Sequence, residues 1–74
     1  MSWNYRVMTQ DGGATYGIHE VYYNSKGEHH SWSSEPITPQ GDDQTDLKSD
    51  LEHMLLAYEK PILEEIDGKL VEKA

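Results

Sequence analysis

Residues 15–32 read TYGIHEVYYNSKGEHHSW, and this stretch decides the fold. Its first ten residues carry three Tyr together with Ile18 and Val21, which are side chains that favour β-strands. The next five, NSKGE, are typical of a type I turn closed by a glycine bulge, with Gly27 at the left-handed position. Residues 28–35 then return as a second strand. The stretch therefore predicts an antiparallel hairpin.

The predicted turn also fixes how the hairpin strands pair. It pairs Asn24 with Glu28, Tyr23 with His29, Tyr22 with His30, Glu20 with Trp32, and His19 with Ser33. Side chains alternate between the two faces of a sheet, so each face holds its own set. The first set is Tyr16, Ile18, Glu20, Tyr22, His30, Trp32 and Ser34. The second set is Gly17, His19, Val21, Tyr23, His29, Ser31 and Ser33.

We assign the first face to the core beneath a helix, because it has more apolar bulk. The reverse assignment stays open. An ionised Glu20 is costly to bury unless it is paired. On the other face, Gly17 and the serines would admit a helix closely.

The flanking residues extend the hairpin to a three-stranded sheet. Residues 3–10, WNYRVMTQ, alternate in the manner of a strand, and Asp11-Gly12-Gly13 is a turn signal. At the other end, Pro36 and Pro39 stop the third strand because proline donates no hydrogen bond.

A helix follows the sheet. Asp43 is a suitable N-cap, and Asp46 three residues later resembles a capping box. Pro61 ends the helix or kinks it. One apolar stripe runs along it, formed by Leu47, Leu51, Met54, Leu55 and Tyr58. If this stripe covers the sheet, Leu51→Ala should lower the free energy of unfolding by about 2–5 kcal/mol.

The pattern predicts one α+β domain, a three-stranded antiparallel sheet with β-β-β-α order and one amphipathic helix packed on one face. Residues 1–60 form this domain. Residues 61–74 form a tail, which is either a short second helix with Pro61 at its first position or partly disordered. A chain of 74 residues makes a single domain with a modest core.

The net charge is −8, and all of it lies in residues 28–74 because the charges of residues 1–27 sum to zero. Six scattered cations among fourteen anions argue against direct nucleic-acid binding, which needs clustered Lys and Arg. The same field favours a basic protein partner. Alternatively, the acidity only keeps the domain soluble.

The sequence has no cysteine, so disulfides and Cys-based zinc sites are excluded. It has no apolar run long enough to span a bilayer, and the residues MSWNYR are not typical of a signal peptide. We therefore expect a soluble, cytoplasmic protein with no membrane partner.

The residues give no pattern for catalysis or for a cofactor. The sequence lacks GxSxG, HExxH and a phosphate-binding glycine loop. In the predicted register, His19 and His29 share a face but lie roughly 13 Å apart, too far for one metal ion. We expect no enzyme activity, no metal and no cofactor.

Binding of a protein is the function that the pattern favours. One helix covers one face of a sheet, so aromatic side chains near His stay exposed on the other face. The candidate partner-binding residues there are His19, Tyr23 and His29, with Leu56 on the outer side of the helix. We predict a non-enzymatic interaction module that binds a basic partner or forms a homo-oligomer.

Two alternatives remain open. One is a small-ligand or metal-binding protein that uses the His and Tyr residues of the hairpin. The other is an enzyme subunit that is active only in a complex.

Two short motifs resemble the HicB-like antitoxin family of small bacterial proteins. Tyr5-Arg6-Val7 is similar to the start of that family's first strand. Residues 41–47, GDDQTDL, followed by Asp50-Leu51, are similar to its helix entry and amphipathic helix. The resemblance covers most of residues 4–58 as an order of elements. It implies an α+β fold and a tendency to oligomerise or to mask a basic protein.

Overall fold

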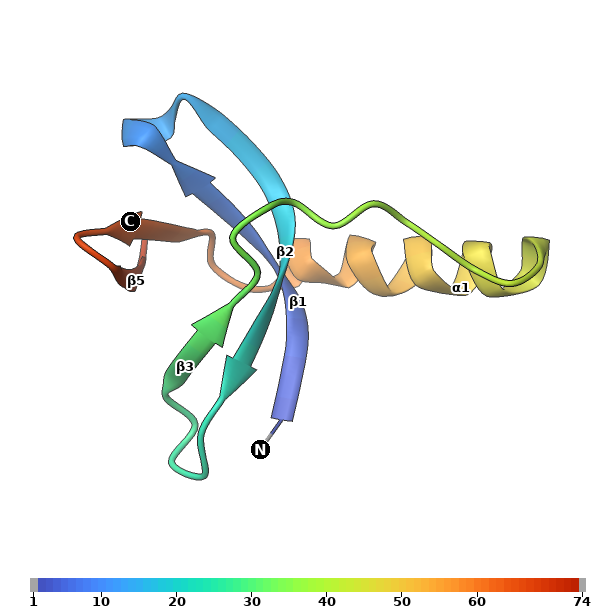
Figure 1. Cartoon of the computed structure of the whole chain (residues 1–74), viewed down its shortest axis with the longest axis horizontal. Helices are drawn as coiled ribbons and strands as arrows, with labels where there is room; N and C mark the ends of the chain where they lie inside the picture. Colours follow the sequence, from blue (N-terminus) through green and yellow to red (C-terminus); the bar gives the residue numbers. More distant parts are fainter. Residues whose placement is uncertain (1, 74) are drawn as a thin grey trace.

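The computed structural model describes residues 2–73 and confirms an α+β fold, in which one helical segment extends from a curled sheet (Figure 1). The strands are β1 (Ser2–Gln10), β2 (Thr15–Tyr23), β3 (His29–Trp32), β4 (Leu63–Ile66) and β5 (Lys69–Glu72). The helices are α1 (Gln44–Leu55) and two 3₁₀ helices, η1 (Asp11–Gly13) and η2 (Leu56–Glu59). The sheet has five strands in the order β3-β2-β1-β4-β5, so the prediction of three strands was too few.

The first two strands pair over their full lengths, from Ser2 opposite Tyr23 to Gln10 opposite Thr15. The turn between them needs three successive residues with positive φ, which are Asp11, Gly12 and Gly13 at 55°, 68° and 94°. Glycine adopts this conformation without a steric penalty, which is why the DGG sequence makes the turn.

The second hairpin begins as predicted and then shifts by one residue. Its turn forms with Gly27 at φ 78°, and Tyr23 lies opposite His29. A β-bulge follows. Beyond it, the pairs are Tyr22 with Ser31 and Val21 with Trp32. The predicted pairs Tyr22–His30 and Glu20–Trp32 were therefore wrong, because a bulge inserts one unpaired residue and moves every later side chain to the other face.

Residues after Pro61 form a hairpin, so the predicted short helix or disordered tail was wrong. β4 pairs in parallel with β1, where Leu63 lies opposite Met8, and β5 returns antiparallel to β4. Asp67 and Gly68 make the turn with φ of 51° and 76°. Two successive left-handed residues are the signature of a type I′ turn, which suits the twist of a two-residue hairpin.

The core lies on the face that we had left as the reverse assignment. Met8, Val21, Leu63 and Leu70 are buried together, and Tyr23 and Trp32 pack against them. The sheet curls over this face, so that Trp32 Nε1 donates a hydrogen bond to Glu65 Oε1 at 3.4 Å. The assignment of Ile18, Glu20 and Tyr22 to the core was wrong because β4 and β5, rather than a helix, cover the sheet.

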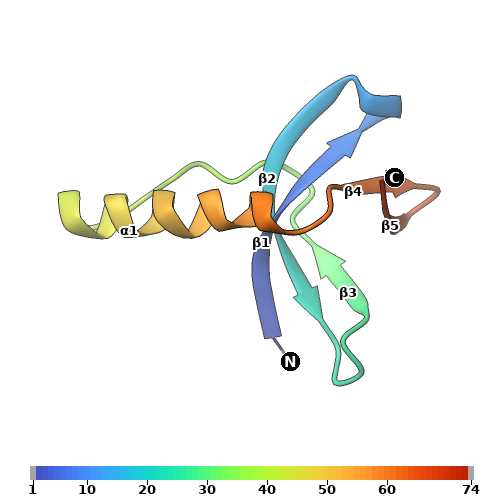
Figure 2. The same ribbon diagram turned by 180° about the vertical axis from the view of Figure 1, so that it is seen from behind.

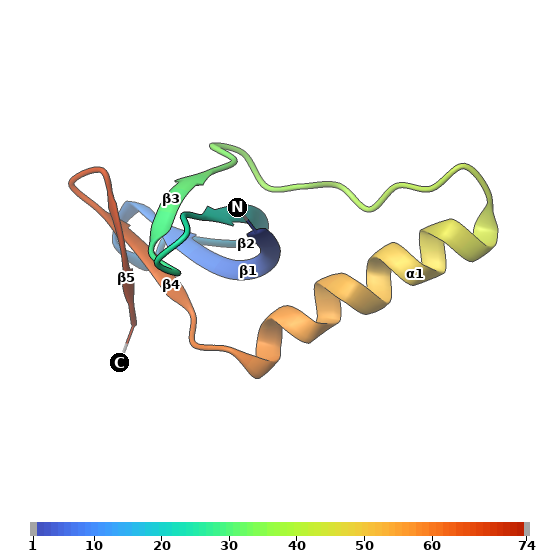
Figure 3. The ribbon, with the colours of Figure 1, turned by 90° about the horizontal axis from the view of Figure 1, so that it is seen from below.

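The helix forms where predicted but does not cover the sheet. It begins after Asp43 and ends before Pro61. Figure 3 shows α1 extending away from the strands, with its C-terminal half nearest to them. Consistent with this extended shape, the radius of gyration is 12.7 Å, whereas a compact domain of 74 residues would have about 11.3 Å.

Candidate functional site

The projecting segment is the feature of the fold that needs an explanation. We call α1 and η2 together, residues 44–59, the helical arm, and residues 33–43 the strap. Figures 1 and 2 show the arm pointing away from the sheet with the strap running alongside it. The arm begins with Asp43, whose side chain accepts a hydrogen bond from the backbone N–H of Asp46 at 2.8 Å. This N-cap satisfies a backbone donor that would otherwise lack a partner.

One side of the arm is apolar and open to solvent. Met54 and Ala57 are the buried residues of the arm. The stripe beside them is exposed and consists of Leu47 (38%), Leu51 (48%), Leu55 (66%) and Tyr58 (69%). We call these four residues the arm stripe. The amphipathic pattern was recognised from the sequence, but its placement in the core was wrong, because only Met54 of the predicted set is buried.

Asp50 holds the arm, the strap and the sheet together. Tyr5 Oη donates a hydrogen bond to Asp50 Oδ1 at 2.6 Å, and the backbone N–H of Gln40 donates to Asp50 Oδ2 at 3.0 Å. The bond from Tyr5 and that from Gln40 lower the pKa of the Asp50 carboxyl. The same carboxylate raises the pKa of Tyr5 to about 12, because the phenol must keep its proton to donate.

A groove of about 540 Å³ lies where the arm meets β1. Its residues are Trp3, Asn4, Tyr5, Asp50, His53, Leu56, Ala57, Glu59 and Lys60. Trp3 is half exposed, and its ring meets that of Tyr5 edge-on, with centroids 5.2 Å apart. Exposed Trp beside exposed Leu is the composition found at protein interfaces.

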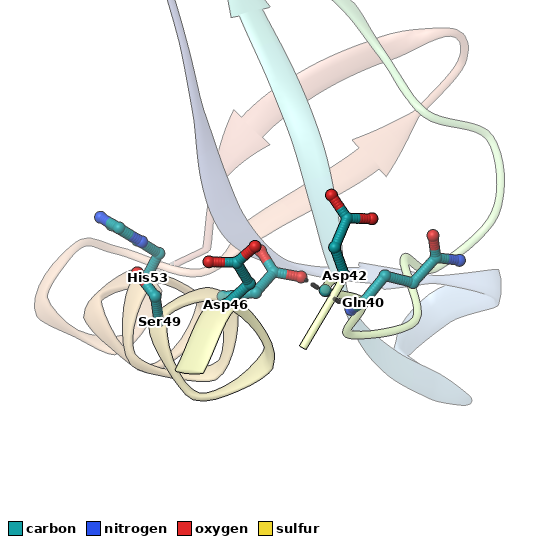
Figure 4. Close-up of a pocket in the computed structure, with 7 residues that line it drawn as sticks. Gln40, Asp42, Asp46, Ser49 and His53 are labelled. Carbon is teal, nitrogen blue, oxygen red and sulfur yellow. Dashed lines mark hydrogen bonds between the residues drawn. The ribbon is translucent and has the colours of Figure 1, made fainter. Parts of the chain in front are cut away.

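A second, more polar hollow lies farther along the arm, between α1 and the strap (Figure 4). Asp42 approaches it from the strap, and Asp46, Ser49 and His53 approach it from the helix (Figure 4). Within residues 2–73, no group of three or more His, Cys, Asp or Glu side chains is placed to hold a metal ion. Asp42, Asp46 and Asp50 all line the hollow, so it forms an acidic surface beside the arm.

The predicted site residues lie on three different parts of the molecule. His19 is buried, and its Nδ1 donates to the Ser33 carbonyl at 2.8 Å, so its side chain is not part of the accessible surface. Tyr23 and His29 are half-buried neighbours, with ring centroids 5.5 Å apart. Leu56 is exposed and lines the groove. The structure thus brings Tyr23 and His29 together and leaves Leu56 with the arm.

Arg6 was not singled out from the sequence, yet it is one of the most unusual residues here. It is 5% exposed, and it donates to Tyr23 Oη at 2.9 Å and to the Pro61 carbonyl at 2.7 Å. Its Nε has no hydrogen-bond partner among residues 2–73. A buried guanidinium held by neutral acceptors ties β1 to the segment that enters β4. Nothing in the sequence near Arg6 signals this, since Pro61 is distant in the chain.

Comparisons with family models, with curated proteins and with solved structures found no match. Within the described part of the chain, no helix is long and apolar enough to cross a membrane.

Proposed function

We propose that this chain is a non-enzymatic protein-interaction module that binds its partner through the arm stripe. The observation that carries the proposal is the exposure of four large apolar side chains on one side of a projecting helix. A row of residues spaced three or four apart is the arrangement by which amphipathic helices dock onto other proteins. Contiguous apolar surface of this kind is uncommon on a protein that works alone.

The rest of the molecule supports a role in binding. The arm is anchored by Tyr5, Asp50 and the buried Met54, so it is presented in a fixed direction. A presented helix loses little conformational freedom on binding, which favours affinity. The open groove near Trp3 and Leu56 lies on the other side of the arm and is separate from this stripe, so a change at Leu56 leaves the stripe intact.

We also propose that the module acts in the cytoplasm, in keeping with a sequence that has no cysteine. A HicB-like role belongs to the same proposal, since masking of another protein needs a binding surface but no catalytic group.

Two variants of equal charge test the proposal. Leu51→Lys places a cation in the middle of the arm stripe, whereas Leu56→Lys places one on the opposite side of the arm. Both side chains are about half exposed, so neither change should unfold the protein. We expect immobilised parent and Leu56→Lys proteins to retain the same binding partner, including free copies of the chain itself, and Leu51→Lys to lose it. Equal retention by both variants would contradict binding through the stripe.

A further inference from the structure

We propose that the partner of the arm stripe is a second copy of this chain, and that two arms pair antiparallel about a two-fold axis near Leu51. This inference rests on the proposed function and names the partner. It follows from the exposed area of the chain, from the spacing of the stripe and from the charges beside it.

The exposed area matches what a dimer needs. The chain exposes 5316 Å², whereas a compact protein of 8.5 kDa exposes about 4,700 Å². The excess, roughly 600 Å², approaches the ~800 Å² that each partner buries in a stable interface. A second copy seated on the arm would bring the exposed surface of each chain close to that of an ordinary compact domain.

The stripe is symmetric about its own centre. Leu47 and Leu55 each lie four residues from Leu51, on the same side of the helix. In an antiparallel pair centred on Leu51, each Leu47 therefore meets the Leu55 of the other copy, and the two Leu51 side chains meet each other. A surface that complements itself under a two-fold rotation is what a symmetric dimer requires.

The charges beside the stripe select the antiparallel direction. Lys48 and Glu52 flank the same edge of the stripe, one on each side of Leu51. Antiparallel pairing places Lys48 of one copy near Glu52 of the other, twice in each dimer. In a parallel two-fold pair this edge would instead face the opposite edge of the other copy, so the contacts between Lys48 and Glu52 would not form. The helix dipoles also oppose each other favourably only in the antiparallel arrangement.

The remaining carboxylates of α1 do not obstruct this contact. Asp50 faces inward to Tyr5 and Gln40, and Asp46, four residues earlier, lines the hollow toward the strap. The net charge of −8 still makes two copies repel each other at long range. Because charges more than ~8 Å apart are largely screened at physiological salt, the dimer should tighten between low and physiological ionic strength.

Sedimentation at both ionic strengths, over the micromolar to millimolar range, tests the pairing. We expect the parent and Leu56→Lys to form dimers that tighten with salt, and Leu51→Lys to remain monomeric. The control is strict because both variants reduce the net negative charge equally. Lower net charge alone would favour association, so a monomeric Leu51→Lys shows that position 51 lies in the contact. A Leu51→Lys protein that dimerises like the parent would overturn the pairing, as would a dimer that weakens with salt.

Cysteine cross-linking tests the direction, and the absence of native cysteine makes the result unambiguous. Leu51→Cys should cross-link to itself under mild oxidation. Leu47→Cys and Leu55→Cys should cross-link to each other when mixed, but neither should cross-link to itself. Self-cross-linking of Leu47→Cys would show parallel arms and overturn the antiparallel proposal.

The two proposals fail in different ways. A parent that is monomeric at millimolar concentration overturns the second copy as partner. The broader interaction-module proposal then depends on whether another protein is retained by the parent and lost by Leu51→Lys. If the stripe variant changes neither self-association nor retention, both proposals are overturned.

Discussion

One hydrogen bond at the residue scale sets the direction of the whole arm. Tyr5 belongs to the central strand of the sheet and Asp50 to the middle of α1, and the bond between them is short, at 2.6 Å. Gln40 adds the strap to the same carboxylate. The relative placement of β1, the strap and α1 thus depends on a protonated Tyr5 phenol and an ionised Asp50 carboxylate.

The ionisation of Tyr5 gives the first prediction. Because its folded pKa is about 12, above its ordinary value of 10.0, this bond stabilises the fold fully below pH 10 and is lost as the pH rises toward 12. For Asp50 the pKa is lowered, so its contribution is present above its ordinary pKa of 3.8 and is lost as the pH falls through the folded value.

An ultraviolet absorbance titration of the tyrosines measures this. We expect Tyr5→Phe to remove a tyrosine that ionises late, near pH 12, and Asp50→Asn to make Tyr5 ionise earlier. An unchanged high-pH region in the Tyr5→Phe titration would show that the bond to Asp50 does not form.

A pair of leucines separates the core from the arm. Leu63 is fully buried, whereas Leu51 is about half exposed. Leu63→Ala should therefore lower the free energy of unfolding by about 2–5 kcal/mol, because it leaves a cavity. In the monomer, Leu51→Ala should lower it by less than about 0.5 kcal/mol. Urea denaturation at low protein concentration distinguishes the two, and a larger effect at Leu51 would place the arm on the sheet after all.

At the element scale, local patterns were read correctly and a distant pairing was not. The strands near Trp3 and Tyr22, the turn at Gly27 and the helix after Asp43 follow from strand propensity, turn chemistry and capping. The last hairpin was also signalled, by Asp67-Gly68 between short alternating segments. The apolar residues after Pro61 also fit a helical spacing, and the prediction followed that spacing, because short segments can fit both periods.

The terminal hairpin gives a prediction about the smallest unit that folds. A chain that ends at Lys60 lacks Leu63 and Leu70, which are half of the buried apolar cluster. It also lacks the Pro61 carbonyl that accepts from Arg6. We expect this shorter chain to be unfolded, as judged by the loss of dispersion in its amide NMR spectrum. A well-dispersed spectrum would show that residues 1–60 form a domain alone.

At the scale of the whole molecule, the candidate site was only partly predictable. Leu56 was identified as an outer contact and lines the groove, and the stripe at Leu47 and Leu51 was recognised as apolar. Whether such a stripe faces inward or outward depends on what else covers the sheet. Here β4 and β5 take that place, and a parallel pairing across more than fifty residues leaves no local trace in the sequence.

The overall charge gives the last prediction. The net charge of −8 repels phosphate, and the acidic hollow beside Asp42 and Asp46 strengthens that field along the arm. At near-physiological salt, micromolar protein should not retard duplex DNA or RNA in a gel. A salt-sensitive micromolar complex would contradict this expectation.

The parallel pairing of β1 with β4 also sets the order of events during synthesis. β1 occupies the centre of the sheet, yet one of its two neighbours is made only when Leu63 and Glu64 are added. Long-range strand pairing of this kind is slow to form. Until then, the edge of β1 that later pairs with β4 is unpaired. Met8 also lacks the cover that Leu63 later provides. The nascent chain must therefore remain incompletely folded until β4 has been made.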